Sequence, residues 1–376
     1  MDIFSTLLSM QAEISLAVVL VVLLLASLLI REPNHRPLQL VACSLLLIQL
    51  ILNVVPSEGE AFGGMYHSTA LTSVVKTLLT GGTLLVFLQS GGWLADKHTH
   101  TRAGEFYFLT LSTLLGMYFM VSAGSFILFY VGLELASIPM ACLVAFDKYR
   151  RHSAEAGAKF ILSSMFSSSL MLYGLSMVYG TCGTVYFSEL SEALTGTPLQ
   201  VLAMVFFFSG LGFKLSLVPF HMWTPDVYQG GPTSVSAYLS VISKGAAAFA
   251  LCSILVKVFS GMIAHWSLML SVVIVITITV GNVFAILQTD MKRFMAYSSI
   301  SQAGYIVLAA LSGSDQGTAS LVYYVAVYIV ANLAVFGVIG AVERQTGGVV
   351  ERNAYAGLYT TNPHCLLYTS PSPRDT

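Results

Sequence analysis

Three ionisable side chains of this sequence lie deep within apolar segments. Glu134 and Lys244 lie about 12 and 14 Å from the nearer ends of their segments at 1.5 Å per residue, and Lys214 lies past the middle of its own. A charge at the centre of a bilayer costs about 2.5–3.5 kcal/mol on insertion scales. Burial lowers the pKa of a lysine, whereas a nearby carboxylate raises it. Lysines under both influences can therefore exchange protons near neutral pH. We therefore predict a proton relay.

These residues also have structural interpretations. Glu134 could be a protonated carboxyl group bonded to a neighbouring helix, and Lys214 could extend its ammonium group to the surface. Gly210, Gly212 and Pro219 argue against a purely structural Lys214, because they loosen the helix where a charge needs carbonyl groups or water.

Two further lysines lie near the ends of their segments. Lys159 and Lys76 by themselves fit side chains that reach the surface. The segment that holds Lys159 also carries a face of small hydroxyls, which suits either close helix packing or a lining for water. The hydroxyl residues are Ser163, Ser164, Ser167, Ser168 and Ser169.

The stretch 214–233 is polar and rich in Pro and Gly, yet it lies between two apolar segments. Irregular backbone at membrane depth must be covered by protein or line a wet cavity. His221 could exchange protons near pH 7, and Asp226, directly after Pro225, suits a helix start. The alternative for both residues is a capped, hydrogen-bonded re-entrant loop.

The composition sets the environment of these residues. Of 376 residues, 56% are apolar and only 9% are charged, against roughly 25% charged in a soluble domain. An ordinary cytosolic enzyme, a disordered chain and a basic nucleic-acid binder are excluded, and the net charge of −1 implies no polyanionic partner. The five cysteines form no CxxC pair, and no metal site is predicted.

Eleven segments are long enough to span a hydrocarbon core, which needs about 20 apolar residues each. No strand-like alternation is present, so we predict an all-α polytopic bundle. The segments are Ile14–Ile30, Leu38–Val55, Ala70–Leu88, Phe106–Ser122, Phe126–Ala145, Ala156–Tyr179, Leu199–Leu217, Val235–Val258, Trp266–Leu287, Met295–Leu311 and Thr318–Val342.

Loop charge predicts the orientation. Eleven basic residues flank one side of these segments, whereas Lys257 is the only basic residue on the other. The basic loops are therefore expected in the cytoplasm and the N-terminus outside. The start of the chain lacks a basic region, so the first segment is not expected to be a cleaved signal peptide.

Three runs identify a family. His221–Thr233, Ile242–Lys244 and Asp290–Ser301 resemble the antiporter-like membrane subunits of respiratory complex I and of Mrp-type cation/proton antiporters. Within this family they look most like the N-type subunits of bacterial NADH-quinone oxidoreductases. The resemblance reaches about residue 356 and is strongest from Glu134 to Tyr305.

The resemblance implies an antiporter-like bundle with a broken seventh helix. Its N-terminal helices occupy residues 1–123 and its proton-translocating core occupies residues 124–342. Residues 343–376 are expected to hold the truncated start of a twelfth helix, near Ala354, and a tail foreign to the fold.

The resemblance also implies roles for the ionisable residues. Glu134 is expected to pair with Lys159, Lys214 is the central lysine at the broken helix, and Lys244 continues the path. His221 and Asp226 are possible accessory residues of the relay.

By the same resemblance, the chain is a proton-translocating membrane subunit of NADH-quinone oxidoreductase in a bacterial inner membrane. NADH, FMN, iron–sulfur clusters and quinone would bind partner subunits, and no cofactor would bind this chain. Its partners would be other membrane-arm subunits and the lipid bilayer, with no nucleic acid. Two alternatives are a subunit of an Mrp-type antiporter without electron transfer, and a structural spacer between subunits.

Overall fold

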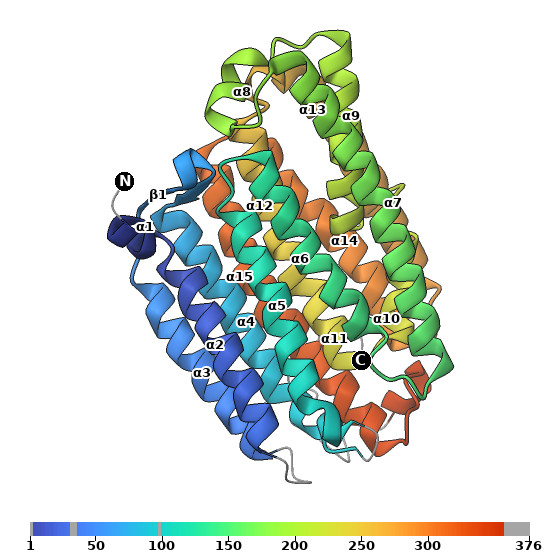
Figure 1. The fold of residues 1–376 in the computed structure, drawn as a ribbon. Helices are drawn as coiled ribbons and strands as arrows, with labels where there is room; N and C mark the ends of the chain where they lie inside the picture. The colour runs from blue at the N-terminus through green and yellow to red at the C-terminus, as the bar shows by residue number, and fades with distance from the viewer. Residues whose placement is uncertain (1–2, 31–35, 97–98, 357–376) are drawn as a thin grey trace.

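The computed structural model describes residues 3–30, 36–96 and 99–356 as a bundle of long helices (Figure 1). Eleven helices of these described residues are long and apolar enough to cross a membrane, so the predicted all-α fold is confirmed. They are α2 (Gln11–Leu29), α3 (Arg36–Val54), α4 (Ala70–Leu94), α5 (Ala103–Val121, with a 3₁₀ turn at His100–Arg102), α6 (Phe126–Val144), α7 (Arg151–Cys182), α9 (Pro198–Leu215), α11 and α12 (Thr233–Tyr238 and Lys244–Lys257, joined by a π-helical segment), α13 (Ile263–Ile286, after a 3₁₀ turn at Ser260–Met262), α14 (Met291–Leu311) and α15 (Asp315–Gln345).

Short elements close the two ends of the bundle. Helices α1 (Ile3–Ser9) and α8 (Phe187–Ala193) and a hairpin of β1 (Gly59–Ala61) and β2 (Tyr66–Ser68) lie at one end. The opposite end holds α10 (Trp223–Gly230) and the start of α11 (Figure 1). The 3₁₀ turn at Phe62–Gly64 joins the two strands.

Polar residues cap several helices at the loops. The side chain of Thr69 accepts a hydrogen bond from Thr72 N at the start of α4, and Thr197 caps α9 in the same way through Gln200. Such caps satisfy backbone N–H groups that a helix start leaves free. The predicted starts agree with these caps to within one residue, because α4 begins at Ala70 as expected and α9 begins at Pro198 rather than Leu199.

The outer faces of the bundle are apolar. Leu29, Leu268 and Ile286 are 70–83% exposed, which in water would leave large apolar areas unburied but in a bilayer places them against lipid tails. The buried polar side chains therefore mark the interior of the bundle, where helices meet each other.

The seventh segment is broken, as predicted. Helix α9 ends at Leu215, Ser216 has a left-handed φ of 63°, and α10 begins at Trp223. Protein groups satisfy the irregular backbone between them, because Trp223 Nε1 donates to Phe213 O (3.1 Å) and Val218 N donates to Thr277 Oγ1 (3.0 Å). Protein groups thus hold the irregular backbone at the break, although the side chain of Met222 is 74% exposed.

The chain after α15 forms only a 3₁₀ turn, Arg352–Tyr355, among the residues that the structure describes. The expected start of a twelfth helix near Ala354 is therefore not seen there. The tail predicted to be foreign lies outside the described residues from 357 onward.

Candidate proton-relay site

Lys214 lies next to the helix face that carries Glu134. The Lys214 side chain is 4% exposed, and its Nζ donates a hydrogen bond to Ser137 Oγ (2.7 Å). Ser137 follows Glu134 by three residues in α6, so both side chains project from one face of that helix. Lys214 also interacts electrostatically with Glu134. The structure thus brings these two predicted residues together.

The Glu134 carboxyl group is held in a polar niche between α6 and α7. Its Oε1 is buried and receives no hydrogen bond from the described residues. The Tyr130 hydroxyl interacts with Glu134 and with Ser168 of α7. Buried carboxyl oxygens carry a large desolvation penalty unless they meet a donor, so this niche suits a bound water or a transferable proton.

The serine face of α7 is divided by the packing. Ser164, Ser167 and Ser168 are buried, whereas Ser163 and Ser169 are not. Ser167 faces α9, where its Oγ donates to Ser209 O (3.4 Å), whereas Ser168 interacts with Tyr130 of α6. Close helix packing and a polar lining therefore occur on the same face.

Lys244 is 1% exposed and forms a second polar cluster. Its Nζ donates to Ser299 Oγ (2.7 Å) and lies over the ring of Tyr228, 5.6 Å from the ring centroid. The hydroxyl groups of Tyr228 and Ser299 are 3.3 Å apart, and Tyr328 also faces Ser299. Hydroxyl groups and a ring thus surround the Lys244 amino group, and no carboxylate among the described residues forms an ion pair with it.

A π-helical segment, Leu239–Ser243, directly precedes Lys244. Asn332 of α15 donates a hydrogen bond to Ser240 Oγ in this segment (3.0 Å). π-helical turns are rare and occur frequently at functional sites. The segment changes the helical register at Lys244, which the sequence pattern alone did not predict.

Lys159 does not pair with Glu134, so that expectation is wrong. The Lys159 ammonium group is instead 2.7 Å from Asp226 Oδ2 and 2.9 Å from Glu155 Oε1, and the side chain is 44% exposed. Lys159 lies near the start of α7, two helical turns from the buried serines, where carboxylates of α10 and of its own helix are closer than Glu134.

Asp226 forms ion pairs with basic side chains rather than capping a helix. It lies in the first turn of α10, but its carboxylate joins Lys159 to Arg293 Nη1 (2.8 Å), so the predicted capping role is wrong. Partial burial would raise the pKa of Asp226, but hydrogen bonds and charges from Lys159 and Arg293 outweigh it and hold the pKa below its usual value. This carboxyl group therefore stays ionised in its ion pairs.

His221 lies in the loop between α9 and α10. Its Nδ1 is buried without a hydrogen-bond partner among the described residues. Burial lowers the pKa of His221, which is partly countered by the carbonyl group of Pro219. A neutral imidazole that can pick up a proton fits an accessory position, although no described residue joins it to the lysines.

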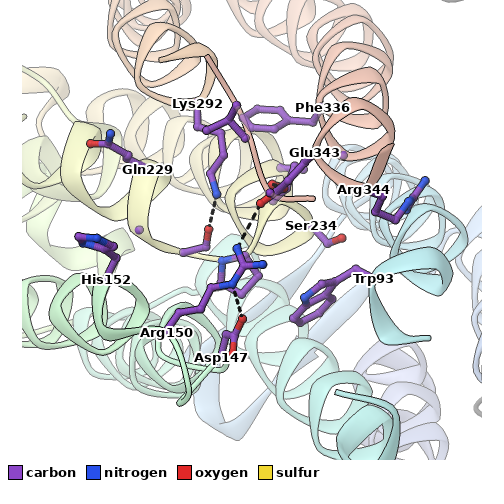
Figure 2. Close-up of a pocket in the computed structure, with 18 of the residues that line it drawn as sticks. Trp93, Asp147, Arg150, His152, Gln229, Ser234, Lys292, Phe336, Glu343 and Arg344 are labelled. Atoms are coloured by element: carbon purple, nitrogen blue, oxygen red, sulfur yellow. Dashed lines mark hydrogen bonds and ion pairs between the residues drawn. The ribbon is translucent and has the colours of Figure 1, made fainter. Parts of the chain in front are cut away.

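A cavity of about 950 Å³ opens at the end of the bundle that carries Asp226. Figure 2 shows Arg150, Lys292 and Glu343 pointing into it. Lys292 Nζ donates to Gly231 O (2.7 Å), and Arg150 pairs with Asp147 and Glu343. Charged groups of both signs line the cavity, which water must therefore fill.

The sequence interpretation missed one buried ion pair. Lys76 does not reach the surface: it is fully buried, and its Nζ lies 2.7 Å from Glu13 Oε1, so the expectation for Lys76 is wrong. The position of Glu13 near a segment end hid it, because a charge there normally faces water. Among the described residues, no group of three His, Cys, Asp or Glu side chains could hold a metal ion.

Comparisons with known proteins agree with this geometry. Residues 123–370 match the family described as NADH:quinone oxidoreductase/Mrp antiporter, TM. NADH-quinone oxidoreductase subunit N of Phocaeicola vulgatus is 64% identical over 98% of this chain and 78% of its own length. The same subunit of Azobacteroides pseudotrichonymphae is 49% identical over 96% of this chain and 76% of its own length.

Solved structures show the same fold. A chain of respiratory complex I from Thermus thermophilus superposes with a TM-score of 0.75 at 30% identity, covering 95% of this chain and 76% of that one. A chain of the Mrp complex from Dietzia superposes with a TM-score of 0.76, but at 20% identity this likeness concerns the fold alone. It covers 91% of this chain and 65% of that one.

Proposed function

Because this chain belongs to the NADH:quinone oxidoreductase/Mrp antiporter transmembrane family, we propose that it is a proton-translocating membrane subunit of an NADH-quinone oxidoreductase. The family match covers the core of the chain, and the relative at 64% identity is an NADH-quinone oxidoreductase subunit. The chain is a multi-pass membrane protein whose partners are other membrane subunits of the complex and the lipid bilayer.

Electron transfer belongs elsewhere in such a complex. NADH, FMN, iron–sulfur clusters and quinone bind partner subunits in this proposal, and this chain supplies proton movement only. Quinone reduction would change charges at the membrane arm, and that change would pass along the buried Glu and Lys residues. No nucleic acid is a partner.

The observation that carries the relay is the burial of Lys214 and Lys244 against hydroxyl groups. Each ammonium group donates to a serine, Ser137 or Ser299, and each lies in a helix that is broken or π-helical. A serine hydroxyl accepts a hydrogen bond from the lysine and can donate a hydrogen bond to water. These lysines are therefore held for proton exchange rather than for pairing with a fixed carboxylate.

The path begins at the water-filled cavity. Lys159 and Asp226 lie on its wall, and Tyr228, in the same short helix as Asp226, lies against Lys244. Buried Ser243 Oγ, Ser301 Oγ and Glu134 Oε1 lack protein partners among the described residues. Water at these atoms would connect the lysines to each other and to the cavity.

The basic end of the bundle faces the cytoplasm in this proposal. Arg150, Arg151 and Lys292 lie at the cavity end, whereas the β hairpin and α8 close the other end. Cytoplasmic loops carry an excess of Lys and Arg. Protons would therefore enter from the cavity side, and the N-terminus would lie outside.

The test is proton pumping by the assembled complex in inverted membrane vesicles, driven by NADH. Lys214→Met and Glu134→Gln should each lower the pumping rate several-fold while the complex still assembles, because each removes a proton carrier without adding a charge. Lys257→Met removes an exposed lysine at the far end of α12 and should pump like the wild type.

The two alternatives make opposite predictions in the same assay. An Mrp-type antiporter subunit would move protons against a cation gradient without NADH or quinone. A structural spacer would lose assembly in Lys244→Ala yet keep the turnover of each assembled complex. Wild-type pumping in both Lys214→Met and Glu134→Gln would contradict the relay.

A further inference from the structure

A second buried charge cluster lies in the N-terminal helices, apart from the proposed relay. Glu13 of α2 and Lys76 of α4 form an ion pair of 2.7 Å, with side chains 2% and 0% exposed. The Tyr66 hydroxyl donates to Glu13 Oε2 (2.7 Å) and accepts from Lys76 Nζ (3.1 Å). Lys76 also lies over the rings of Tyr66 and Tyr118, 5.3 and 5.7 Å from their centroids.

A buried ion pair is poor evidence for a purely stabilising role. Desolvation of two charges costs several kcal/mol per ion, and apolar residues of similar size often give equal or better stability. The pair is also within two turns of the helix starts at Gln11 and Ala70, so a short rearrangement connects it to the outer surface. A protonatable pair in this position fits proton exchange.

A small hollow lies beside Lys76. Its volume is about 10 Å³, close to that needed for one water molecule, and Lys76, Asn53, Ser57 and Ser73 line it. The β hairpin lies over this region, with Tyr66 fully buried. Burial, and then the Glu13 carboxylate, raise the pKa of Tyr66 above its ordinary value, so its hydroxyl keeps its proton and donates a hydrogen bond to Glu13.

From the pair, hydroxyl and amide groups lead inward. Thr80 Oγ1 donates to Lys76 O (2.6 Å) and contacts the Tyr118 hydroxyl. Asn53 Nδ2 donates to both Thr80 Oγ1 (3.0 Å) and the Tyr118 hydroxyl (2.6 Å), while Gln49 Nε2 donates to Asn53 Oδ1 (3.0 Å). All of these side chains are buried.

The inward path continues on one face of α4. Ser73, Lys76, Thr80 and Thr83 recur at spacings of three and four residues, so they form a buried polar stripe. The hydroxyl of Tyr238 forms a side-chain interaction with Thr83 and an electrostatic one with Tyr118. Tyr238 is the last residue of α11 and directly precedes the π-helical segment before Lys244. The Tyr238 hydroxyl also bonds to Thr113 Oγ1 (2.8 Å).

We propose that Glu13, Lys76 and Tyr66 form an outer proton-exchange site, which the polar stripe of α4 connects to the Lys244 cluster. The proton moves as a balanced shift: the Lys76 ammonium group gives one proton to the Glu13 carboxylate, which leaves a neutral amine and a neutral carboxyl group, and water in the hollow beside Lys76 exchanges protons with the amine. The net charge of the neutral pair and the ion pair is the same. This inference rests on the proposed proton-translocating function.

The experiment measures NADH oxidation and proton pumping by the assembled complex in inverted vesicles. A double variant, Glu13→Leu with Lys76→Met, removes both charges and leaves neither partner buried alone, so the helices still pack. Tyr66→Phe keeps the ion pair and the ring and removes only the hydroxyl group. We expect at least twofold fewer protons pumped per NADH oxidised in each variant.

Two comparisons decide the result. If the double variant and Tyr66→Phe both pump like the wild type while Lys214→Met does not, the outer site is structural and this inference is overturned, with the relay intact. If Lys214→Met itself pumps like the wild type, the result contradicts the proposed relay, on which this inference rests. Should the double variant not assemble, Tyr66→Phe alone decides, because its packing is unchanged.

The proposed connection along α4 is tested by a matched pair of Thr→Val variants. Thr80→Val removes the hydroxyl group from the stripe at constant size, and should lower pumping in the same way as Tyr66→Phe. Thr77→Val makes the same change one turn away on a half-exposed face, where Thr77 bonds only to Ser73 O. Equal pumping in the two valine variants would overturn the path along α4.

Discussion

The carboxylate of Asp226 joins Lys159, 2.7 Å away on α7, to the short helix α10 at the mouth of the cavity. The same carboxylate holds Arg293 at 2.8 Å, so three elements meet at one side chain. Because α10 also carries Tyr228, whose ring lies against Lys244, a shift of α10 would change the surroundings of the buried lysine. The pair is thus a candidate coupling element.

Asp226→Asn should loosen α10, with an effect that depends on pH. The lowered pKa of Asp226 means that its ion pairs stabilise the protein above the ordinary pKa of an aspartate, about 4, and that this contribution is lost as pH falls through the lowered value. Because the pair is partly exposed, we expect about 1 kcal/mol or less. Hydrogen exchange of the α10 amides in the complex measures it.

At pH 7 these amides should exchange faster in Asp226→Asn than in the wild type, and the difference should shrink toward pH 3. Glu155→Gln is the matched control, since it removes the other, more exposed carboxylate that pairs with Lys159. Equal exchange in Asp226→Asn and the wild type at pH 7 would contradict the structural role of the pair.

Ser137→Ala should slow proton pumping by about tenfold or more. The change leaves the buried Lys214 ammonium group without its hydrogen-bond acceptor, and a bond to a charged group is worth about 1.5–3 kcal/mol. Pumping by assembled complex in vesicles measures the effect. Ser169→Ala, on the exposed side of α7, serves as the control and should pump normally. A wild-type rate in Ser137→Ala would show that Lys214 needs no partner in α6.

Substitutions of Tyr228 separate its ring from its hydroxyl group. Tyr228→Phe keeps the ring under Lys244 and loses only the contact with Ser299, so we expect a modest loss of pumping. Tyr228→Leu also removes the cation–π interaction, worth about 2 kcal/mol when desolvated, and should cost roughly a further tenfold. Identical rates in the two variants would mean that the ring contributes nothing to holding Lys244.

The sequence predicts the helices and the buried lysines well, because both follow from local composition. A charge in a long apolar run, as at Lys214 or Lys244, has few positions other than the interior of a bundle, and the structure confirms that interior for both. The break after Leu215 is predicted for the same reason, since Pro219 and polar residues cannot continue an apolar helix.

Partners across helices are not predictable in this way. The pairing of Lys159 with Asp226 joins residues 67 positions apart, and neither residue type nor spacing selects Asp226 over Glu134. Glu13 and Lys76 each look like surface charges at a segment end, but the hairpin and α5 pack against them, with the rings of Tyr66 and Tyr118 beside Lys76. The division at residues 123 and 342 and the site roles stay predictions.

The contact of α5 with α6 gives the last prediction, since it sets the position of Glu134. A Cβ on Gly116 would overlap backbone atoms of Gly132, Leu135 and Ala136, so Gly116→Ala must push α6 away and should destabilise the subunit by about 1–3 kcal/mol. Gly180→Ala makes the same change in α7 where nothing lies within 4 Å, and should be neutral or stabilising. The amount of each variant in assembled complexes measures this. Equal amounts would mean that α5 and α6 do not need their close approach.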